Sequence, residues 1–273
     1  MSLADLATDP GAAPGELIAA ITAIAPGDRA ALPHVLPLAA HPVPDVRAAA
    51  VSTLPLLVGQ DPPAGVIDVI LTLTSDDDDN VRFWACWALD PEIFTADTER
   101  LRDAFAGRLQ DPVADVRCEA LYWLAYLHDE RVVPLIRTAL SGRRPLPREV
   151  DAAGAYGDVG LYPLVHAHRG TAHPERLEAV RLARRLLSPD GVGDDLLDAL
   201  AGSCRRRTGG EPDLPEYAPW WELADELTSI AAYRAPEIAA GVDSRLNGDD
   251  AARKLLRNDT NLGRLALKHG WTA

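Results

Sequence analysis

A short phrase recurs three times at a constant interval, and it constrains the fold more than any other feature of this chain. Its centre is a Val-Arg pair that follows an acidic stretch, and an alanine stands three residues after the arginine. The pairs are Val46-Arg47, Val81-Arg82 and Val116-Arg117, with successive arginines 35 residues apart. Equal spacing of similar phrases is typical of repeat proteins, whose units bury their apolar faces against one another. The pattern therefore predicts a stack of similar units.

A second apolar segment precedes each copy of the phrase. These segments have apolar residues three and four positions apart, as an amphipathic helix does, and they lie at residues 32–38, 66–71 and 101–109. Each is followed by a polar break such as Gln110-Asp111-Pro112, and proline disfavours helix at the residue before it. Each unit is thus predicted to be two antiparallel helices, and the chain an all-α, right-handed superhelix.

The phrase resembles the Asp-Pro-x-x-x-Val-Arg-x-x-Ala pattern of HEAT repeats. Asp111-Pro112, Val116-Arg117 and Ala120 match it in full, while the first copy lacks the leading aspartate and the second lacks the proline. In this family the valine and alanine face the core, and the arginine bonds to neighbouring repeats as a ladder. The resemblance therefore implies a structural role, not ligand binding, for Arg47, Arg82 and Arg117.

The repeat pattern fades in the second half of the chain. Counting from a turn at Asp158 places Leu146 where the ladder arginine would stand. A polar segment with glycines and a proline, Arg205 to Pro212, reads as a loop and a domain boundary. We therefore predict a HEAT-like solenoid at residues 1–202 and a C-terminal helical cap at 203–273, with cap helices near residues 220–233, 236–240, 249–256 and 262–268.

Charge is distributed unevenly along the chain. Residues 1–130 hold 7 lysines and arginines against 21 aspartates and glutamates, whereas residues 131–273 hold 20 of each. An acidic half repels the phosphate backbone of nucleic acid and favours a basic protein partner. The alternative is that the acidity only keeps the array soluble.

Several classes of protein are disfavoured by simple counts. No run approaches 18 apolar residues, the N-terminus has no secretion signal, and the three cysteines show no CxxC spacing. These features predict a cytoplasmic chain without membrane spans, disulfides, metal sites or cofactors. They leave the oligomeric state open.

The clearest candidate for a binding surface is a set of large side chains on the Val-Arg helices. Positions one, five, and eight or nine after each arginine are the least committed to packing between layers. Those positions place one set on the concave face as a partner-binding site: Phe83, Trp87, Asp90, Tyr122 and Tyr126. The alternative is that curvature packs these aromatic residues between neighbouring helices.

A group of arginines is a second candidate, for anion binding, because the planar guanidinium donates two parallel hydrogen bonds to carboxylate or phosphate. The group comprises Arg143, Arg144, Arg148, Arg181, Arg184 and Arg185, and the segment Arg205–Arg207 could extend it. A solvated face balanced by nearby acidic residues is the alternative.

Evidence for an enzyme is thin. The chain has no HExxH, GxSxG, GxxxxGK[ST] or GxGxxG motif. One enzymatic alternative is a HEAT-like DNA glycosylase for alkylated bases, whose groove residues are superficially similar to Phe83, Trp84, Trp87, Asp90 and Glu119. Because this half of the chain is acidic, we instead predict a non-catalytic scaffold of the adaptor, chaperone or immunity type that grips a basic protein in its concave groove.

Overall fold

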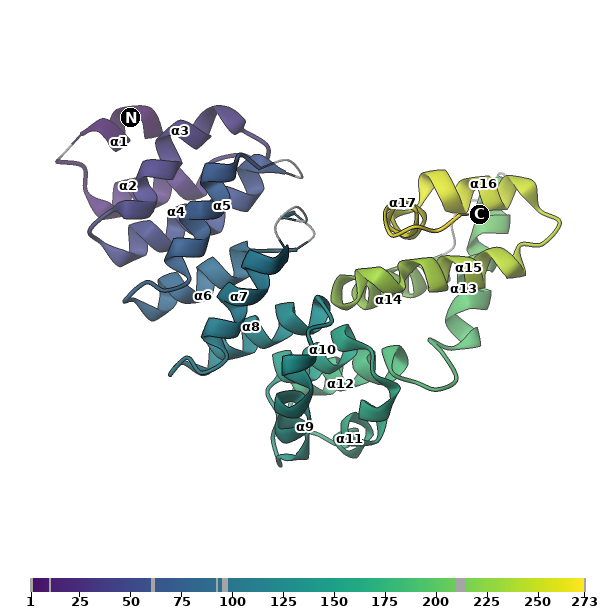
Figure 1. Cartoon of the computed structure of the whole chain (residues 1–273). Helices are drawn as coiled ribbons and strands as arrows, with labels where there is room; N and C mark the ends of the chain where they lie inside the picture. Colours follow the sequence, from purple (N-terminus) through teal and green to yellow (C-terminus); the bar gives the residue numbers. More distant parts are fainter. Residues whose placement is uncertain are drawn as a thin grey trace. The chain divides into compact units, whose positions relative to one another are not determined.

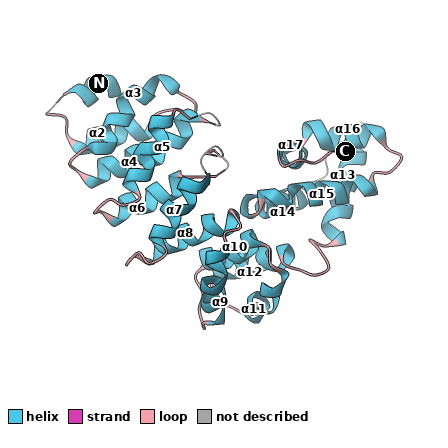
Figure 2. Ribbon diagram, in the orientation of Figure 1, coloured by secondary structure: helices cyan, strands magenta, loops and turns pink. Residues whose placement is uncertain are grey.

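The regular secondary structure is helical throughout the described part of the chain (Figures 1 and 2). The computed structural model describes residues 2–9, 11–59, 62–91, 93–94, 98–209 and 215–272. These residues form helices α1 to α17 and several short 3-10 segments, and contain no strand. The predicted all-α class is confirmed. Two compact units are present, Met1–Asp129 and Glu130–Ala273.

The first unit is built from helix pairs. Helices α2, α4, α6 and α8 pack against one another in chain order, and α3, α5 and α7 each pack on the helix that follows. The bounds are α1 Leu3–Thr8, α2 Pro14–Thr22, α3 Leu32–Val35, α4 Pro44–Val58, α5 Ala64–Leu73, α6 Asp79–Ala88, α7 Thr98–Arg108 and α8 Ala114–Tyr126. The paired helices agree with the predicted repeat, and the repeated phrase opens α4, α6 and α8.

The repeated phrase serves both as a helix start and as core. Pro44 occupies the first turn of α4, where its missing N–H leaves no hydrogen bond unmade. In α6 the Asp78 side chain accepts a hydrogen bond of 3.1 Å from the Val81 N–H, which caps the helix. The phrase's valines and alanines are fully buried in all three copies: Val46, Ala50, Val81, Ala85, Val116 and Ala120.

The second unit begins with two further helix pairs. Helix α10 packs on α9 and α12, and α11 packs on α9 and α12. A methyl group added at Gly154 of α10 would lie 3.1 Å from Leu186 Cδ1 of α12, so the glycine permits close approach. The bounds in this unit are α9 Val133–Ser141, α10 Pro147–Tyr156, α11 Tyr162–Ala167, α12 Pro174–Leu186, α13 Asp194–Thr208, α14 Ala218–Ile230, α15 Ala235–Arg245, α16 Asp250–Asp259 and α17 Asn261–Lys268.

The C-terminal segment differs from its prediction at one point. Arg205–Arg207, predicted as part of a loop, form the last turn of α13, where positive charge complements the helix dipole. Residues 210–212 of that predicted loop lie outside the described residues. The boundary after residue 202 falls inside α13, and the division into solenoid and cap stays a prediction. The helices expected after residue 215 are present as α14 to α17.

Candidate functional site

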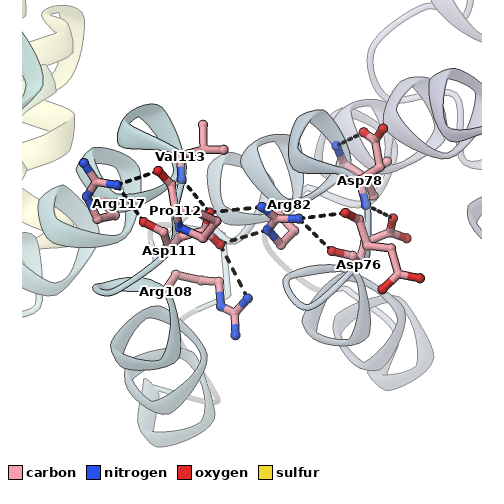
Figure 3. Close-up of polar contacts among 10 residues, drawn as sticks. Asp76, Asp78, Arg82, Arg108, Asp111, Pro112, Val113 and Arg117 are labelled. Atoms are coloured by element: carbon pink, nitrogen blue, oxygen red, sulfur yellow. Dashed lines mark hydrogen bonds and ion pairs between the residues drawn. The ribbon is translucent and has the colours of Figure 1, made fainter.

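Arg82 is the most buried of the three ladder arginines, and Figure 3 shows its polar contacts. Its Nε and Nη2 donate hydrogen bonds of 2.8 and 3.0 Å to the two carboxylate oxygens of Asp111 in the next repeat. Its Nη1 donates to the backbone carbonyl oxygens of Asp76 and Asp77, each at 3.0 Å. A single guanidinium thus joins the turn before its own helix to the turn of the following repeat.

The ladder has one further complete rung and then ends. Arg47 binds the Asp76 carboxylate at 2.9 and 2.7 Å, and in both complete rungs the aspartate stands 29 residues after the arginine. Arg117 also bonds to two turn carbonyls, those of Asp111 and Pro112. The residue 29 positions after Arg117 is Leu146, so no carboxylate is available there.

Electrostatics within the ladder favour the charged pair. Burial alone opposes ionisation of the Asp111 carboxyl, but hydrogen bonds from Arg82 and the Val113 N–H, with the charges of Arg82 and Arg108, outweigh it. The pKa of Asp111 consequently lies below its ordinary value. The pKa of Asp76 is lowered in the same way, against burial, chiefly by the hydrogen bond from Arg47. Both carboxylates are therefore ionised partners of their arginines at neutral pH.

Helix α6 carries the exposed part of the predicted partner-binding set. Trp87 is 36% exposed, and Phe83 and Trp84 are half-buried. The Trp84 ring lies edge-on to its two neighbours, with centroids 5.3 Å from Phe83 and 5.4 Å from Trp87. This edge-to-face arrangement is favourable between aromatic rings. The three rings form one contiguous aromatic surface, named the α6 aromatic surface below.

The tyrosines of α8 do not share this exposure. Tyr122 is 2% exposed and Tyr126 9% exposed, contrary to the expectation that they stand on a solvent-facing ridge. The reason lies in the helix, since every residue from Cys118 to Tyr126 is buried and this part of α8 has no solvent-facing side. Asp90, just beyond α6, is half-buried. A role for these three residues in partner binding stays a prediction.

The predicted arginine group is divided by the structure. Arg181 pairs with Glu178 and Glu226, and Arg185 pairs with Asp195. Arg148 and Arg184 are half-buried. Arg143 and Arg144 instead line a cavity with Arg176, His168 and His173. Arg176 and the two histidines were not among the predicted residues. The pair His173-Pro174 did indicate a helix start at this place in the sequence.

One member of the glycosylase-like set of residues is enclosed in the core. Glu119, one of the glycosylase-like residues, is 4% exposed and lies in the core close enough to Cys86 for its charge to act on the thiol. Burial, with the charge of Glu119, raises the pKa of Cys86 to about 12, so the thiol stays protonated and unreactive. Among the residues that the structure describes, no group of three or more histidine, cysteine, aspartate or glutamate side chains could hold a metal ion.

Membrane insertion finds no support in the described helices, since none is both long and apolar enough to cross a bilayer.

Comparison with known proteins identifies the repeat. The family model for HEAT repeats matches residues 32–113. Protein YibA from two strains of Escherichia coli, K12 and O157:H7, is 33% identical over 99 residues, which are 36% of this chain and 35% of the relative. The chain thus covers little more than a third of the length of these relatives.

A solved structure confirms the architecture. The X-ray structure of Escherichia coli YibA superposes with a TM-score of 0.54 at 22% identity, over 68% of this chain and 67% of that one. At this level of identity the superposition shows a shared fold and nothing beyond it. The predicted HEAT-like helical solenoid is confirmed.

Proposed function

We propose that this chain, whose residues 32–113 match the HEAT-repeat model and whose fold resembles that of Escherichia coli YibA, is a non-catalytic scaffold for a basic protein partner. HEAT repeats commonly mediate protein interactions. The proposed contact is the α6 aromatic surface of the first unit, aided by the acidic charge of that unit. In this role the chain acts as an adaptor, chaperone or immunity-type scaffold.

The observation that carries the proposal is the exposure of Trp87. A tryptophan that keeps 36% of its surface in water forgoes part of the hydrophobic stabilisation that burial would supply. Its ring is held by Trp84, which in turn contacts Phe83, so little side-chain entropy is lost when a partner covers it. Rigid, partly exposed tryptophans of this kind are frequent interface anchors.

Acidic side chains supply the complementary charge. Asp45, Asp79 and Asp115 stand in the first turns of α4, α6 and α8, and all three are exposed. None of them has an ion-pair partner among the described residues, in contrast to Asp76 and Asp111 of the ladder. Exposed carboxylates without an ion-pair partner accelerate encounter with a basic protein and repel nucleic acid.

Affinity capture from the source cell tests the proposal, with the wild-type chain and the variant Trp87→Ala as baits. Truncating an anchor weakens binding by at least about 1 kcal/mol, or fivefold. We expect one basic protein to be retained by the wild type, released by salt and largely lost from Trp87→Ala.

A matched control is Leu267→Ala, which removes another exposed apolar side chain, 42% exposed, from the second unit. It is expected to retain the partner fully. Undiminished capture by correctly folded Trp87→Ala would contradict the anchor, and salt-independent capture of an acidic protein would contradict the charge argument. The triple variant Asp45→Asn, Asp79→Asn, Asp115→Asn should flatten the salt dependence without altering the anchor.

A further inference from the structure

The second unit contains a basic cavity that the protein-binding proposal does not use. The cavity has a volume of about 680 Å³, within the range of small-molecule sites. Two connections form it: the one between α9 and α10 contributes Arg143 and Arg144, and the one between α11 and α12 contributes His168 and His173. Arg176, in the first turn of α12, completes the wall. No acidic residue is among the described residues that line it.

The arginines of this cavity differ from other arginines of the same unit. Arg181, Arg185 and Arg253 each bind a carboxylate, at 2.7 Å to Glu226, 2.8 Å to Asp195 and 2.7 Å to Asp243. Arg143 and Arg144 are exposed and make no hydrogen bond or ion pair within the described part of the chain. Their ten N–H donors, five on each guanidinium, face solvent at the cavity.

Arg176 is held in place without being neutralised. Its Nε donates a hydrogen bond of 2.6 Å to the Pro145 carbonyl oxygen, and its Nη1 donates one of 3.3 Å to Thr171 Oγ1. Both acceptors are uncharged, so the positive charge of Arg176 is not balanced by a carboxylate. A cation fixed in this way is preorganised for an anion, because no rotamer entropy has to be lost on binding.

The surrounding backbone is also braced. His168 Nε2 lies 2.7 Å from the Leu140 carbonyl oxygen, which ties the α11–α12 connection to the end of α9. His173 Nδ1 accepts a hydrogen bond from the Arg176 N–H at 3.4 Å, and the N-terminus of the 13-residue helix α12 opens there. The positive end of the helix dipole adds to the field of the three arginines. Glu175 is the nearest acidic residue in sequence, and it is exposed and does not line the cavity.

We propose that this cavity binds a small molecule that carries a diphosphate group. Three guanidinium groups, two exposed and one fixed, offer paired donors to several phosphate oxygens at once, and arginine matches phosphate geometry with two parallel hydrogen bonds. The cavity is larger than one phosphate requires, and the net charge of its lining matches a group with more than one negative charge. The second unit thus combines a scaffold of paired helices with a ligand site.

Isothermal titration calorimetry of the full chain near physiological salt tests the proposal with three probes: inorganic pyrophosphate, ADP and citrate. Pyrophosphate is expected to bind, and ADP distinguishes a nucleotide from a free diphosphate as the source of the group. Binding of citrate as tightly as pyrophosphate would overturn the assignment to phosphate. Absence of binding by both phosphate probes would overturn the site.

Variants that remove the same charge at different places distinguish binding in this cavity from a general attraction of anions to the basic surface. The double variant Arg143→Ala, Arg144→Ala and the single variant Arg176→Gln should each weaken pyrophosphate binding about tenfold or more, because charge-assisted hydrogen bonds are lost. The double variant Arg137→Ala, Arg181→Ala removes two paired arginines of the same unit and should bind pyrophosphate as the wild type does. Equal losses in both double variants would refute the site. An unchanged thermal midpoint shows that each variant is folded, and Arg143 and Arg144 are exposed enough to be removed without disturbing the core.

Discussion

Replacing Arg82 with alanine removes the buried rung of the ladder and leaves a charge without its partner. Asp111 would keep one hydrogen bond, from the Val113 N–H at 3.1 Å, and a contact of 3.6 Å with Arg108. Its side chain is only 1% exposed, so in the native chain it depends on protein groups for its hydrogen bonds. The carbonyl oxygens of Asp76 and Asp77 would also lose their donors.

The magnitude follows from this arrangement. Removing one partner of a buried ion pair costs about 3–5 kcal/mol, and the remaining donors of Val113 and Arg108 place Arg82→Ala at the lower end, about 3 kcal/mol. Arg117→Ala is the matched control, because Arg117 makes the same two carbonyl contacts with no carboxylate in the described residues. It should cost only about 1 kcal/mol.

Hydrogen exchange followed by mass spectrometry measures the effect where it arises. In a repeat array each unit depends chiefly on its neighbours, so the opening free energy should fall across α6 to α8 and stay unchanged in α10 and α12. Similar losses for Arg82→Ala and Arg117→Ala, or a loss spread evenly over both units, would refute the reasoning.

The pH dependence supplies an independent check on the same pair. The lowered pKa of Asp111 means that the rung stabilises the fold above the ordinary aspartate pKa of about 4, and that this stability is lost as the pH falls through the lowered value. In Arg82→Ala, burial without the arginine favours the protonated acid. The stability gap between wild type and variant should therefore narrow as the pH falls below about 4, and a constant gap would contradict the assigned cause.

Two further predictions concern the core. Cys86, whose burial raises the pKa of the thiol to about 12, should resist iodoacetamide at pH 8 in the native chain and react only after denaturation, as followed by mass spectrometry; rapid native labelling would show that α6 is open. Gly263→Ala should lower the thermal midpoint strongly because the new Cβ would lie 1.9 Å from the Leu256 carbonyl oxygen, whereas its control Gly107→Ala, in open space within α7, should raise it slightly by improving helix propensity. A thermal midpoint that falls no further in Gly263→Ala than in Gly107→Ala would contradict the packing of α16 on α17.

Much of the fold was predictable because its signals are local. The Val-Arg phrases mark the starts of α4, α6 and α8, and their valines are buried as the pattern requires. The loop prediction for Arg205–Arg207 was wrong because a run of charged residues before glycines is compatible with either a loop or a helix end. The structure shows the helix end.

The candidate sites were less predictable, and α8 shows why. Periodicity assigns Trp87 and Tyr122 to the same position in successive repeats, yet Trp87 is 36% exposed and Tyr122 is 2% exposed. Exposure depends on which elements cover a helix, and helical spacing does not contain that information. The same holds for Arg143 and Arg181, since only one of them has a glutamate within reach.

The amino-acid sequence by itself determined most of the helices and their pairing into repeats, because hydrophobic periodicity, proline and capping residues act within a few positions along the chain. Only the tertiary structure decided which arginines are neutralised by carboxylates and which line a cavity with Arg176. The pairing of each arginine depends on which side chains the fold brings within a few ångströms from other helices. Hydrogen bonds and desolvation energies change steeply over such distances, and spacing along the sequence does not fix them.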